Sequence, residues 1–356
     1  MGEVLTIVPD MVNDCWDAYG APVEIARVRE MSAEVSTNRV YRLELVDGSS
    51  VFAKVSTYGS FVHFRQDHQR IHRWCQLLEK TRFGRLMARV LCRDDEPFLY
   101  REGHAWAVLY EEVPVREMLP PILGEPDIVA LGHETAALHA ACESFASELP
   151  PTWKTLGSDI AQLSEQLDRV QWCEERGMTS VTASFVRVHC DAFLTNADTL
   201  GYHSWAKIPV LVDWNIGNFS IERPEPGQGG DAFRLFSRWD YDWLRIEPAV
   251  LDFYFLSRVV SSVGDRTTFS YGVEPLLEPR FQLFLQAYHE VRPLDPGEIM
   301  FLKEVYRFFL LNYVIREGEF FFRPEICGRL RREILEIHLP ELEQARFDSL
   351  LRSLGL

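Results

Sequence analysis

The spacing of hydrophobic positions divides the chain into a strand-rich first part and a helical second part. Apolar and polar residues alternate over residues 39–45 and 50–55, and Asp47-Gly48 lies between the two runs. This pattern predicts a β-hairpin. Helical spacing follows over residues 64–78, and apolar runs at 86–92 and 105–113 come after it. The predicted order is therefore strand, strand, helix, strand, strand.

Beyond residue 113, prolines interrupt the chain, and an amphipathic pattern predicts a helix over residues 128–141. The chain is predicted to be largely helical to about residue 205 and again after Pro248. Two short β-like runs, 208–212 and 233–239, bracket a Pro/Gly-rich loop at 224–230. The clearest C-terminal helical patterns span residues 298–314, 325–338 and 341–351. The pattern predicts an α+β protein with a β-rich lobe, 1–113, and a larger helical lobe, 114–356.

Composition agrees with a soluble two-lobed protein. A chain of 356 residues with 47% hydrophobic residues exceeds the size at which a single core usually divides. No apolar run reaches the roughly 18 residues that a membrane helix needs, and no basic region precedes an apolar stretch at the N-terminus. The seven cysteines are dispersed without metal-binding spacing, which is typical of reduced thiols. We expect a cytoplasmic protein without a membrane partner.

The charge of the chain narrows the class of partner. The formal net charge is −16, and no cluster of Lys and Arg with interleaved aromatic residues offsets it locally. Such a surface repels a phosphate backbone, so no nucleic acid partner is expected. A small-molecule substrate that carries positive charge is compatible with it. The sequence indicates no oligomeric state.

The residues that phosphoryl transfer needs occur in chain order. This chemistry uses a Lys on the phosphates, an Asp that orients or deprotonates the hydroxyl, and Asn and Asp for Mg²⁺. Lys54 lies on the second strand of the predicted hairpin, where a lysine commonly faces solvent. In residues 210–219 an apolar strand leads to Asp213, and Asn218 follows after a short turn with Gly217. This spacing lets Asp213 and Asn218 converge on one Mg-phosphate group.

The segment with Asp213 resembles the aminoglycoside phosphotransferase and choline kinase-like superfamily. That family carries H-G-D-x-x-x-x-N, usually ending in Pro-Gly-Asn, and Asp213, Gly217 and Asn218 match it. Residues 238–252 are similar to the family's metal-binding stretch, in which an Asp after a strand is followed by an acidic residue, a Pro and a second Asp that opens a helix. These four places are taken by Asp240, Asp242, Pro248 and Asp252.

The resemblance covers roughly residues 30–260 and implies a bilobal protein-kinase-like fold that binds ATP and Mg²⁺ between its lobes. It implies that Asp213 is the catalytic residue, that Asn218 and Asp240 bind the metal, and that Lys54 contacts the phosphates. Ser36 and Asn38 would lie in a phosphate-covering loop, and Glu111 and Val113 in a hinge whose backbone binds adenine.

Two departures from the family pattern have structural consequences. Leu211 and Val212 replace the usual His and Gly before the catalytic Asp, so the hydrogen bonds of that His must come from elsewhere. The Glu that pairs with the strand Lys has no clear counterpart. Asp67 shares a helical face with apolar residues at a suitable distance and is preferred to Glu79 as the partner of Lys54.

A second alignment with the catalytic motif is available. His189, Asp191 and Asn196 fit H-x-D-x-x-x-x-N with the His retained, and Asp213 would then bind metal. Asp213 is favoured as the base because Asp240 follows it with the expected metal-binding pattern. His189 is then interpreted as a helical residue on a half-buried face.

Aromatic and acidic residues beside the motifs are candidates for the acceptor site. Trp214, Trp243 and Asp242 are the predicted substrate contacts, whereas Trp239 is interpreted as packing. The preferred function is transfer of the ATP γ-phosphate to a hydroxyl of an amino-sugar, choline-like molecule or sugar alcohol. The alternative is a catalytically weak kinase-fold protein that binds nucleotide or a partner. A protein kinase is disfavoured because no A-P-E-like segment follows the metal-binding stretch.

Overall fold

The computed structural model describes residues 4–32, 38–150, 152, 154–225, 227, 230–265 and 270–356. The chain forms two compact units. The first comprises Met1–Pro114 together with Ser237–Asp242, and the second comprises Val115–Phe236 and Trp243–Leu356. The sequence placed the boundary near residue 113 but did not assign Ser237–Asp242, which contains two candidate site residues, to the first unit.

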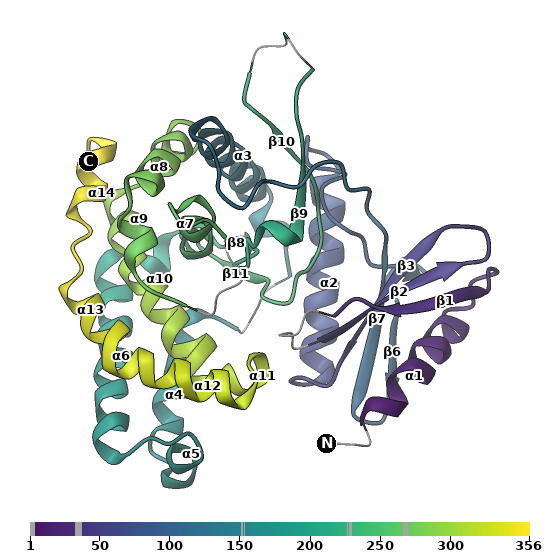
Figure 1. The fold of residues 1–356 in the computed structure, drawn as a ribbon, viewed down its shortest axis with the longest axis horizontal. Helices are drawn as coiled ribbons and strands as arrows, with labels where there is room; N and C mark the ends of the chain where they lie inside the picture. Colours follow the sequence, from purple (N-terminus) through teal and green to yellow (C-terminus); the bar gives the residue numbers. More distant parts are fainter. Residues whose placement is uncertain are drawn as a thin grey trace. The chain divides into compact units, whose positions relative to one another are not determined.

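The first unit is built on a five-stranded antiparallel sheet (Figure 1). The strands lie in the order β1 (Ile25–Glu30), β2 (Asn38–Leu45), β3 (Ser50–Ser56), β7 (Ala105–Glu111) and β6 (Leu99–Glu102). The predicted hairpin is β2 and β3, whose register pairs Val40 with Lys54. β3 also pairs with β7, so Lys54 lies on the central strand and not at an edge of the sheet.

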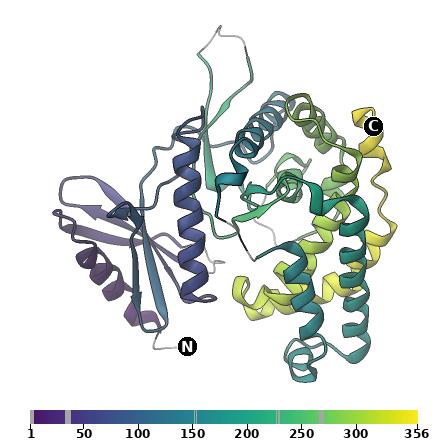
Figure 2. The same ribbon diagram turned by 180° about the vertical axis from the view of Figure 1, so that it is seen from behind.

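A helix covers each face of this sheet. Helix α1 (Val4–Tyr19) places Trp16 in a core with Ala53 and other apolar residues of β2, β3 and β7. Because side chains alternate along a strand, Lys54 points to the opposite face. Helix α2 (Phe61–Leu78) covers that face, as Figures 1 and 2 show.

The first unit differs from the expectation in three added elements and in one expected strand. The sequence pattern did not indicate α1, β1 or β6. The expected strand over residues 86–92 is mostly irregular: β4 is Cys92–Arg93, paired with β5 (Glu96–Pro97), and single bridges join Val90 to Tyr110 and Met87 to Arg238. Isolated bridges, and not a continuous ladder of hydrogen bonds, therefore join the apolar run at 86–92 to its neighbours.

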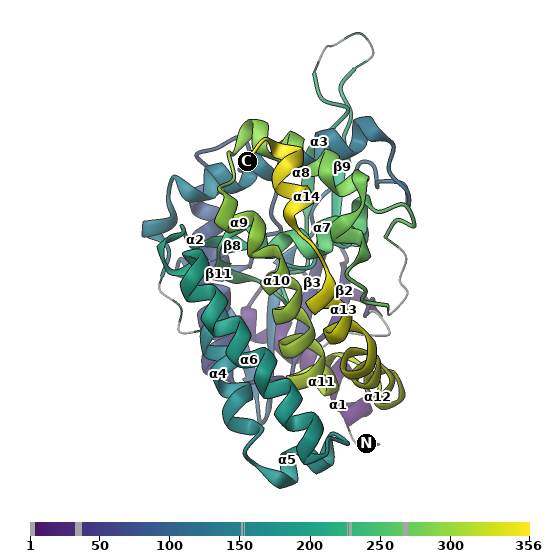
Figure 3. The same cartoon turned by 90° about the vertical axis from the view of Figure 1, so that its left-hand side faces the viewer.

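The second unit is mainly helical, and α4, α6 and α10 lie side by side in it (Figure 3). Its helices are α3 (Glu125–Glu143), α4 (Leu156–Gln166), α5 (Val170–Glu175), α6 (Ser180–Leu200), α7 (Phe253–Val260), α8 (Pro279–Val291), α9 (Pro296–Met300), α10 (Leu302–Phe308), α11 (Gly318–Phe321), α12 (Pro324–Glu333), α13 (Leu339–Gln344) and α14 (Asp348–Leu354). None of the described helices is both long and apolar enough to cross a membrane. Gly132 lets α3 approach α8 closely, because a Cβ there would lie 2.7 Å from the Phe284 carbonyl oxygen.

The long C-terminal helices predicted from the pattern are divided. The run 298–314 covers α9, α10 and the π-helical segment η6 (Phe309–Arg316). The run 325–338 comprises α12 followed by a second π-helical segment, η7 (Ile334–His338). Hydrophobic spacing over one or two turns does not separate α-helical from π-helical turns, so the pattern predicted single helices.

Two short strand pairs carry the segments of the candidate site. β8 (Ile208–Val210) pairs with β11 (Arg245–Glu247), and β9 (Phe219–Glu222) pairs with β10 (Arg234–Arg238). The catalytic-loop candidate runs from the end of β8 to the start of β9. The metal-binding candidate runs from the end of β10 to the start of β11.

His68 gives the first unit a measurable dependence on pH. It lies on α2 with 5% of its surface exposed, and burial, together with the charge of Lys54, lowers its pKa to about 3. The unfolded chain takes up this proton near pH 6.5, whereas the folded chain does not until about pH 3, so stability falls as the pH falls. The expected loss is about 2 kcal/mol between pH 7 and 5.

We expect the variant His68→Phe to remove this part of the pH dependence. The ring packs 4.1 Å from Phe64, between centroids, and Phe retains that packing. Urea unfolding of the variant at pH 7 and pH 5 should show a smaller difference than the wild type. His203→Gln is the control, because the His203 side chain is 70% exposed and should leave the difference unchanged. An equal pH dependence in wild type and His68→Phe would contradict the assignment.

Candidate active site

Lys54 is the centre of a polar cluster inside the first unit. Its Nζ lies 3.1 Å from Asp240 Oδ1 and also forms an ion pair with Asp242 Oδ1. Lys54 is 7% exposed, whereas the side chains of Asp240 and Asp242 are 40% and 16% exposed. Lys54 is therefore not a solvent-facing strand lysine, and its contact with the phosphates stays a prediction.

The segment that carries the two carboxylates is tied to the first unit by backbone pairing. Arg238 N–H donates to Leu86 O at 2.6 Å, and Ala88 N–H donates to Arg238 O at 2.9 Å. Tyr241 Oη donates to Ala88 O at 3.1 Å. The apolar run at 86–92 thus holds the chain that presents Asp240 to Lys54.

Burial and charge together set the protonation of this cluster. Burial alone lowers the pKa of Lys54, but the negative charges of Asp240 and Asp242 outweigh it, and the net pKa is raised. Burial raises the pKa of Asp240, but Lys54 outweighs it, so the net pKa is lowered. Burial, with the neighbouring charge of Asp240, raises the pKa of Asp242. Lys54 is thus a permanent cation.

The other nucleotide-binding candidates have separate placements. Asn38 opens β2, and its side chain hydrogen-bonds to Asp242. Ser36 lies outside the described residues. Glu111 is exposed at the end of β7, where its N–H donates to Arg89 O at 2.8 Å, and Val113 follows it in the irregular segment after the strand. The roles of Ser36, Asn38, Glu111 and Val113 in binding nucleotide stay predictions.

Asp67 does not have the predicted contact. It accepts a hydrogen bond from Arg70 on its own helix at 2.9 Å. The ion pairs of Lys54 go instead to Asp240 and Asp242. Both residues belong to the segment Ser237–Asp242, which packs in the first unit. The contacts of the described residues favour these two carboxylates over Asp67 as partners of Lys54.

In the second unit, the loop after β8 brings Asp213 and Asn218 together. Asn218 Nδ2 donates to Asp213 Oδ2 at 3.1 Å, and Asn215 N–H donates to Asp213 Oδ1 at 3.2 Å. Gly217 N–H donates to Asn215 Oδ1 at 2.8 Å, which closes the turn between them. The predicted convergence of Asp213 and Asn218 is present.

A buried network supports the residue before Asp213. Val212 has φ of 60°, a left-handed conformation that is unusual for a β-branched residue. Its N–H donates to Asp252 Oδ1 at 2.6 Å, and Asp252 Oδ2 lies 3.0 Å from His139 Nε2. His139 Nδ1 lies 2.8 Å from Tyr288 Oη. Asp252 and His139 thus brace the loop in which Leu211 and Val212 replace the family's His and Gly.

Backbone strain is concentrated in the two candidate loops. Four described residues other than glycine have positive φ: Asp94, Asp95, Val212 and Asp240. Asp94 and Asp95 form the tight turn between β4 and β5, where such angles are usual. Val212 and Asp240 lie outside such hairpin turns, beside or within the predicted catalytic and metal-binding positions. Strained residues of this kind cluster at functional sites, so their position supports the assignment.

Two further residues beside Asp213 were not identified from the sequence. Asp265 Oδ2 accepts a hydrogen bond from Ile216 N–H at 2.9 Å and so fixes the far side of the turn that follows Asp213. Burial raises the pKa of Tyr271 to about 12, with the charge of Arg258 opposing and that of Asp213 adding to the shift. Neither residue belongs to a motif, and their closeness to Asp213 depends on tertiary structure.

The competing alignment falls within a regular helix. His189 to Asn196 lie in the interior of α6. His189 is 3% exposed, and burial lowers its pKa to about 4, whereas Asp191 is exposed. Asn196 donates to Glu304 Oε1 at 2.8 Å. A helix interior separates the side chains of Asp191 and Asn196 by more than one turn, so this geometry favours Asp213.

Comparison with solved structures identifies the fold. An amicoumacin kinase in complex with AMP-PNP, Ca²⁺ and Ami has a TM-score of 0.64 at 15% identity, with 98% of this chain and 100% of that chain covered. A microcompartment-associated aminopropanol kinase has a TM-score of 0.58 at 15% identity, covering 94% and 97%. A macrolide 2′-phosphotransferase type I has 0.55 at 13% identity, covering 92% and 97%. The chain has the fold of the aminoglycoside phosphotransferases and related small-molecule kinases.

The predicted α+β, kinase-like fold is thereby confirmed. No protein-family model matches the chain, and no curated protein matches it by sequence. The likeness to the kinases therefore lies in the fold, and the roles of individual residues rest on the contacts described above.

Within this kinase fold, one predicted substrate residue is wrongly assigned. Trp214 is 1% exposed and packs edge-to-face on Phe219, 5.7 Å between ring centroids. Its position after Asp213 points it into the core beneath the loop, so it cannot line an acceptor site. Trp243 is half-buried and stacks on Tyr313 at 4.4 Å, in an aromatic cluster with Phe255. Trp243 and Asp242 stay predictions as substrate contacts.

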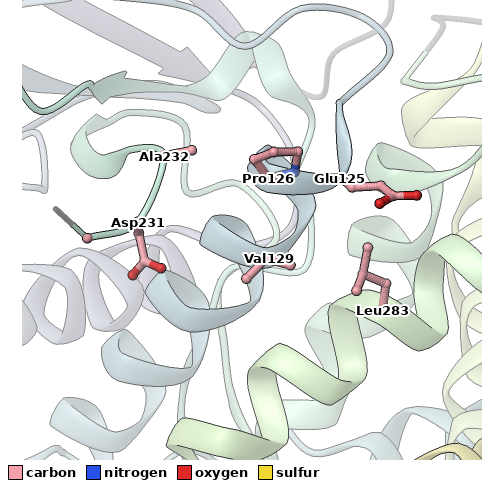
Figure 4. Close-up of a pocket in the computed structure, with 7 residues that line it drawn as sticks. Glu125, Pro126, Val129, Asp231, Ala232 and Leu283 are labelled. Carbon is pink, nitrogen blue, oxygen red and sulfur yellow. The ribbon is translucent and has the colours of Figure 1, made fainter. Parts of the chain in front are cut away.

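Figure 4 shows a pocket of the second unit. Its lining is mainly apolar and includes two carboxylates: Glu125, Pro126, Val129, Gly230, Asp231, Ala232 and Leu283. Asp231 lies 2.8 Å from His133 Nδ1 of α3. None of the predicted site residues lines this pocket, so the assignment of the site does not depend on it.

The oxygen atoms of the two candidate loops suit a hard divalent cation. Carboxylate and amide oxygens are the ligands that Mg²⁺ takes in proteins, usually with substrate phosphates and water completing the shell. Among the described residues, no group of three or more His, Cys, Asp and Glu forms a metal site by itself. The oxygen donors available are the side chains of Asp213 and Asn218 in one loop, and the carboxylates of Asp240 and Asp242 in the other.

We expect Asp252→Ala to destabilise the protein by about 3 kcal/mol, because it leaves the buried Val212 N–H and His139 without their acceptor. Asp252→Asn should lose less, since its amide oxygen can still accept from Val212. Denaturant unfolding measures the difference. The matched control is Asp198→Ala, which breaks an exposed pair with His203 at 2.9 Å and should change stability by less than about 0.5 kcal/mol. Equal losses at the two positions would contradict the bracing role.

Proposed function

We propose that the protein is an ATP- and Mg²⁺-dependent phosphotransferase that acts on a hydroxyl group of a small molecule. The observation that carries this proposal is the presence of two polar clusters, each at a strained loop of a kinase-like fold. Lys54, Asp240 and Asp242 form the first, and Asp213 and Asn218 form the second. Phosphoryl transfer requires these residue types.

Each residue has a defined task in the proposal. Asp213 orients the acceptor hydroxyl and accepts its proton, with its carboxylate held by Asn218 and by the Asn215 N–H. Asn218 and Asp240 would hold Mg²⁺, which when bound neutralises charge on the transferring phosphate. Lys54, a permanent cation, would contact the phosphates. The backbone near Glu111 and Val113 would bind adenine, and Ser36 and Asn38 would cover the phosphates.

The acceptor in this proposal is a small alcohol such as an amino-sugar, a choline-like molecule or a sugar alcohol. The net charge of −16 favours a neutral or cationic acceptor over an anionic one. The aminopropanol kinase among the solved structures with this fold is named for an amino alcohol. A panel of alcohols tested for ATP consumption would identify the acceptor.

The alternative is a kinase-fold protein that binds nucleotide but transfers phosphate slowly. The replacement of the family's His-Gly by Leu211 and Val212 favours it. The network of Asp252 and His139 favours activity instead, because it supplies a brace for the same loop. Thermal stabilisation by Mg-ATP without turnover on any acceptor would select the alternative.

We expect Asp213→Asn to lower turnover by about 10²- to 10⁴-fold, since the amide cannot accept the hydroxyl proton. The amide oxygen can still accept from Asn218, so affinity for Mg-ATP should change little. Steady-state kinetics and calorimetric titration with ATP separate the two effects. Asp191→Asn, on the exposed face of α6, is the control and should retain full activity. Full activity of Asp213→Asn would refute the assignment of the base.

The metal role of Asp240 has a separate test. Asp240→Asn should weaken ATP binding by about tenfold or more when Mg²⁺ is present and much less when EDTA has removed the metal. Asp47→Asn is the control, because Asp47 lies in the exposed hairpin turn of the same unit and bonds to Ser49. Equal weakening with and without metal would show that Asp240 acts on the nucleotide by some other route.

A further inference from the structure

The cluster around Lys54 is already balanced in charge. Lys54 contacts Asp240 and Asp242, and Asn38 adds a hydrogen bond to Asp242. Arg238, which is 1% exposed, lies close enough for its charge to favour the ionised form of Asp240. Two buried cations therefore lie beside two partly buried carboxylates. A divalent cation added to this group would give it a net positive charge.

The geometry of the loop directs both carboxylates at one point. Asp240 has φ of 67°, and Asp242 N–H donates to Asp240 Oδ1 at 3.2 Å, which folds the two residues onto the same side. Asp240 Oδ1 and Asp242 Oδ1 both contact Lys54 Nζ. The ammonium group thus occupies lone pairs of the oxygens that a metal ion would need.

A lysine ammonium and a metal ion cannot share these oxygens at low energy. Both are cations, and their repulsion is larger beside the buried Lys54 than in water, because the effective dielectric constant is lower there. Removing a cation from a pair of partly buried carboxylates without replacing it is also unfavourable. The stable arrangements therefore contain one cation at this position, either the ammonium group or the metal.

We propose that Lys54 is a stand-in cation that excludes divalent metal from Asp240 and Asp242 until nucleotide phosphates draw the ammonium group away. The proposal rests on the proposed function, because it takes Asp240 as a metal ligand and Lys54 as a phosphate ligand. It makes metal binding conditional on nucleotide. Without nucleotide, Lys54 stays paired with Asp240 and Asp242.

The test measures Mn²⁺ binding to the full-length protein without nucleotide, from the electron paramagnetic resonance signal of free Mn²⁺. The wild type should bind weakly. Lys54→Met removes the charge while retaining the length of the side chain, and should bind Mn²⁺ at least about tenfold more tightly. Lys54→Arg retains the charge and should bind as weakly as the wild type. The double variant Lys54→Met, Asp240→Asn should lose the gain.

Lys207→Met is the matched control. Lys207 is a second partly buried lysine, with Nζ 3.6 Å from the buried Glu247 Oε2 in the second unit. Its removal also frees a carboxylate from a lysine, but only one, and the neighbouring Tyr202 Oη still donates to Glu247 at 2.7 Å. Mn²⁺ affinity should stay at the wild-type level. A gain equal to that of Lys54→Met would show a general effect of charge and overturn the proposal.

Thermal unfolding provides a second readout. Mn²⁺ should raise the melting temperature of Lys54→Met and leave that of the wild type nearly unchanged. If Lys54→Met does not fold without metal, its folding in the presence of Mn²⁺ supports the proposal. If it folds in neither condition, Lys54→Gln replaces it in both measurements. Tight binding of Mn²⁺ by the nucleotide-free wild type, or no gain in the Lys54 variants, overturns the proposal.

The outcome is separable from that of the proposed function. Failure of ATP to bind the wild type in the presence of Mg²⁺ would refute the kinase assignment and the nucleotide-dependent release of Lys54. A gain of Mn²⁺ affinity in Lys54→Met would then still establish competition between the ammonium group and the metal. ATP binding and turnover without such a gain would keep the kinase assignment and remove the stand-in role.

Discussion

The ammonium group of Lys54 is the constraint on which the first unit depends. It projects from the central strand of the sheet into the face covered by α2, where an isolated charge would be strongly unfavourable. The chain supplies Asp240 and Asp242 from a segment more than 180 residues away, held by backbone pairing to residues 86 and 88. The backbone contacts of the 86–92 run with Arg238 thus help to place the carboxylates of Asp240 and Asp242 beside Lys54.

Buried hydrogen bonds also hold the loop of the second unit that contains Asp213. Val212 adopts a left-handed conformation that is unfavourable for a β-branched side chain. The buried Asp252 accepts its N–H, and His139 and Tyr288 hold Asp252 in turn. Because every polar atom in this chain of contacts has a partner, the strain at Val212 is stabilised by the surrounding structure and is not relieved by rearrangement. The backbone at Asp213 is therefore held in one conformation.

The loop with Asp213 and the loop with Asp240 share three structural features. Each follows a short strand, each contains a non-glycine residue with positive φ, and in each a carboxylate accepts a nearby N–H: Asp213 from Asn215, and Asp240 from Asp242. Such local hydrogen bonds fix the direction of a carboxylate before any ligand arrives, which reduces the ordering that binding would otherwise require. Pre-organised oxygens of this kind agree with the proposed phosphoryl transfer, whose main demand is the positioning of charged phosphate.

The sequence by itself determined the hairpin with Lys54, the helical second part and the Asp213–Asn218 spacing, because these depend on local alternation and turn chemistry. It also named Asp240 and Asp242, through their resemblance to a known motif. Only the tertiary structure decided that Lys54 is buried between them, that Asp67 pairs with Arg70, and that Trp214 faces the core. Burial and ion pairing depend on which distant segments come into contact, and the local pattern of residues along the chain does not specify those contacts.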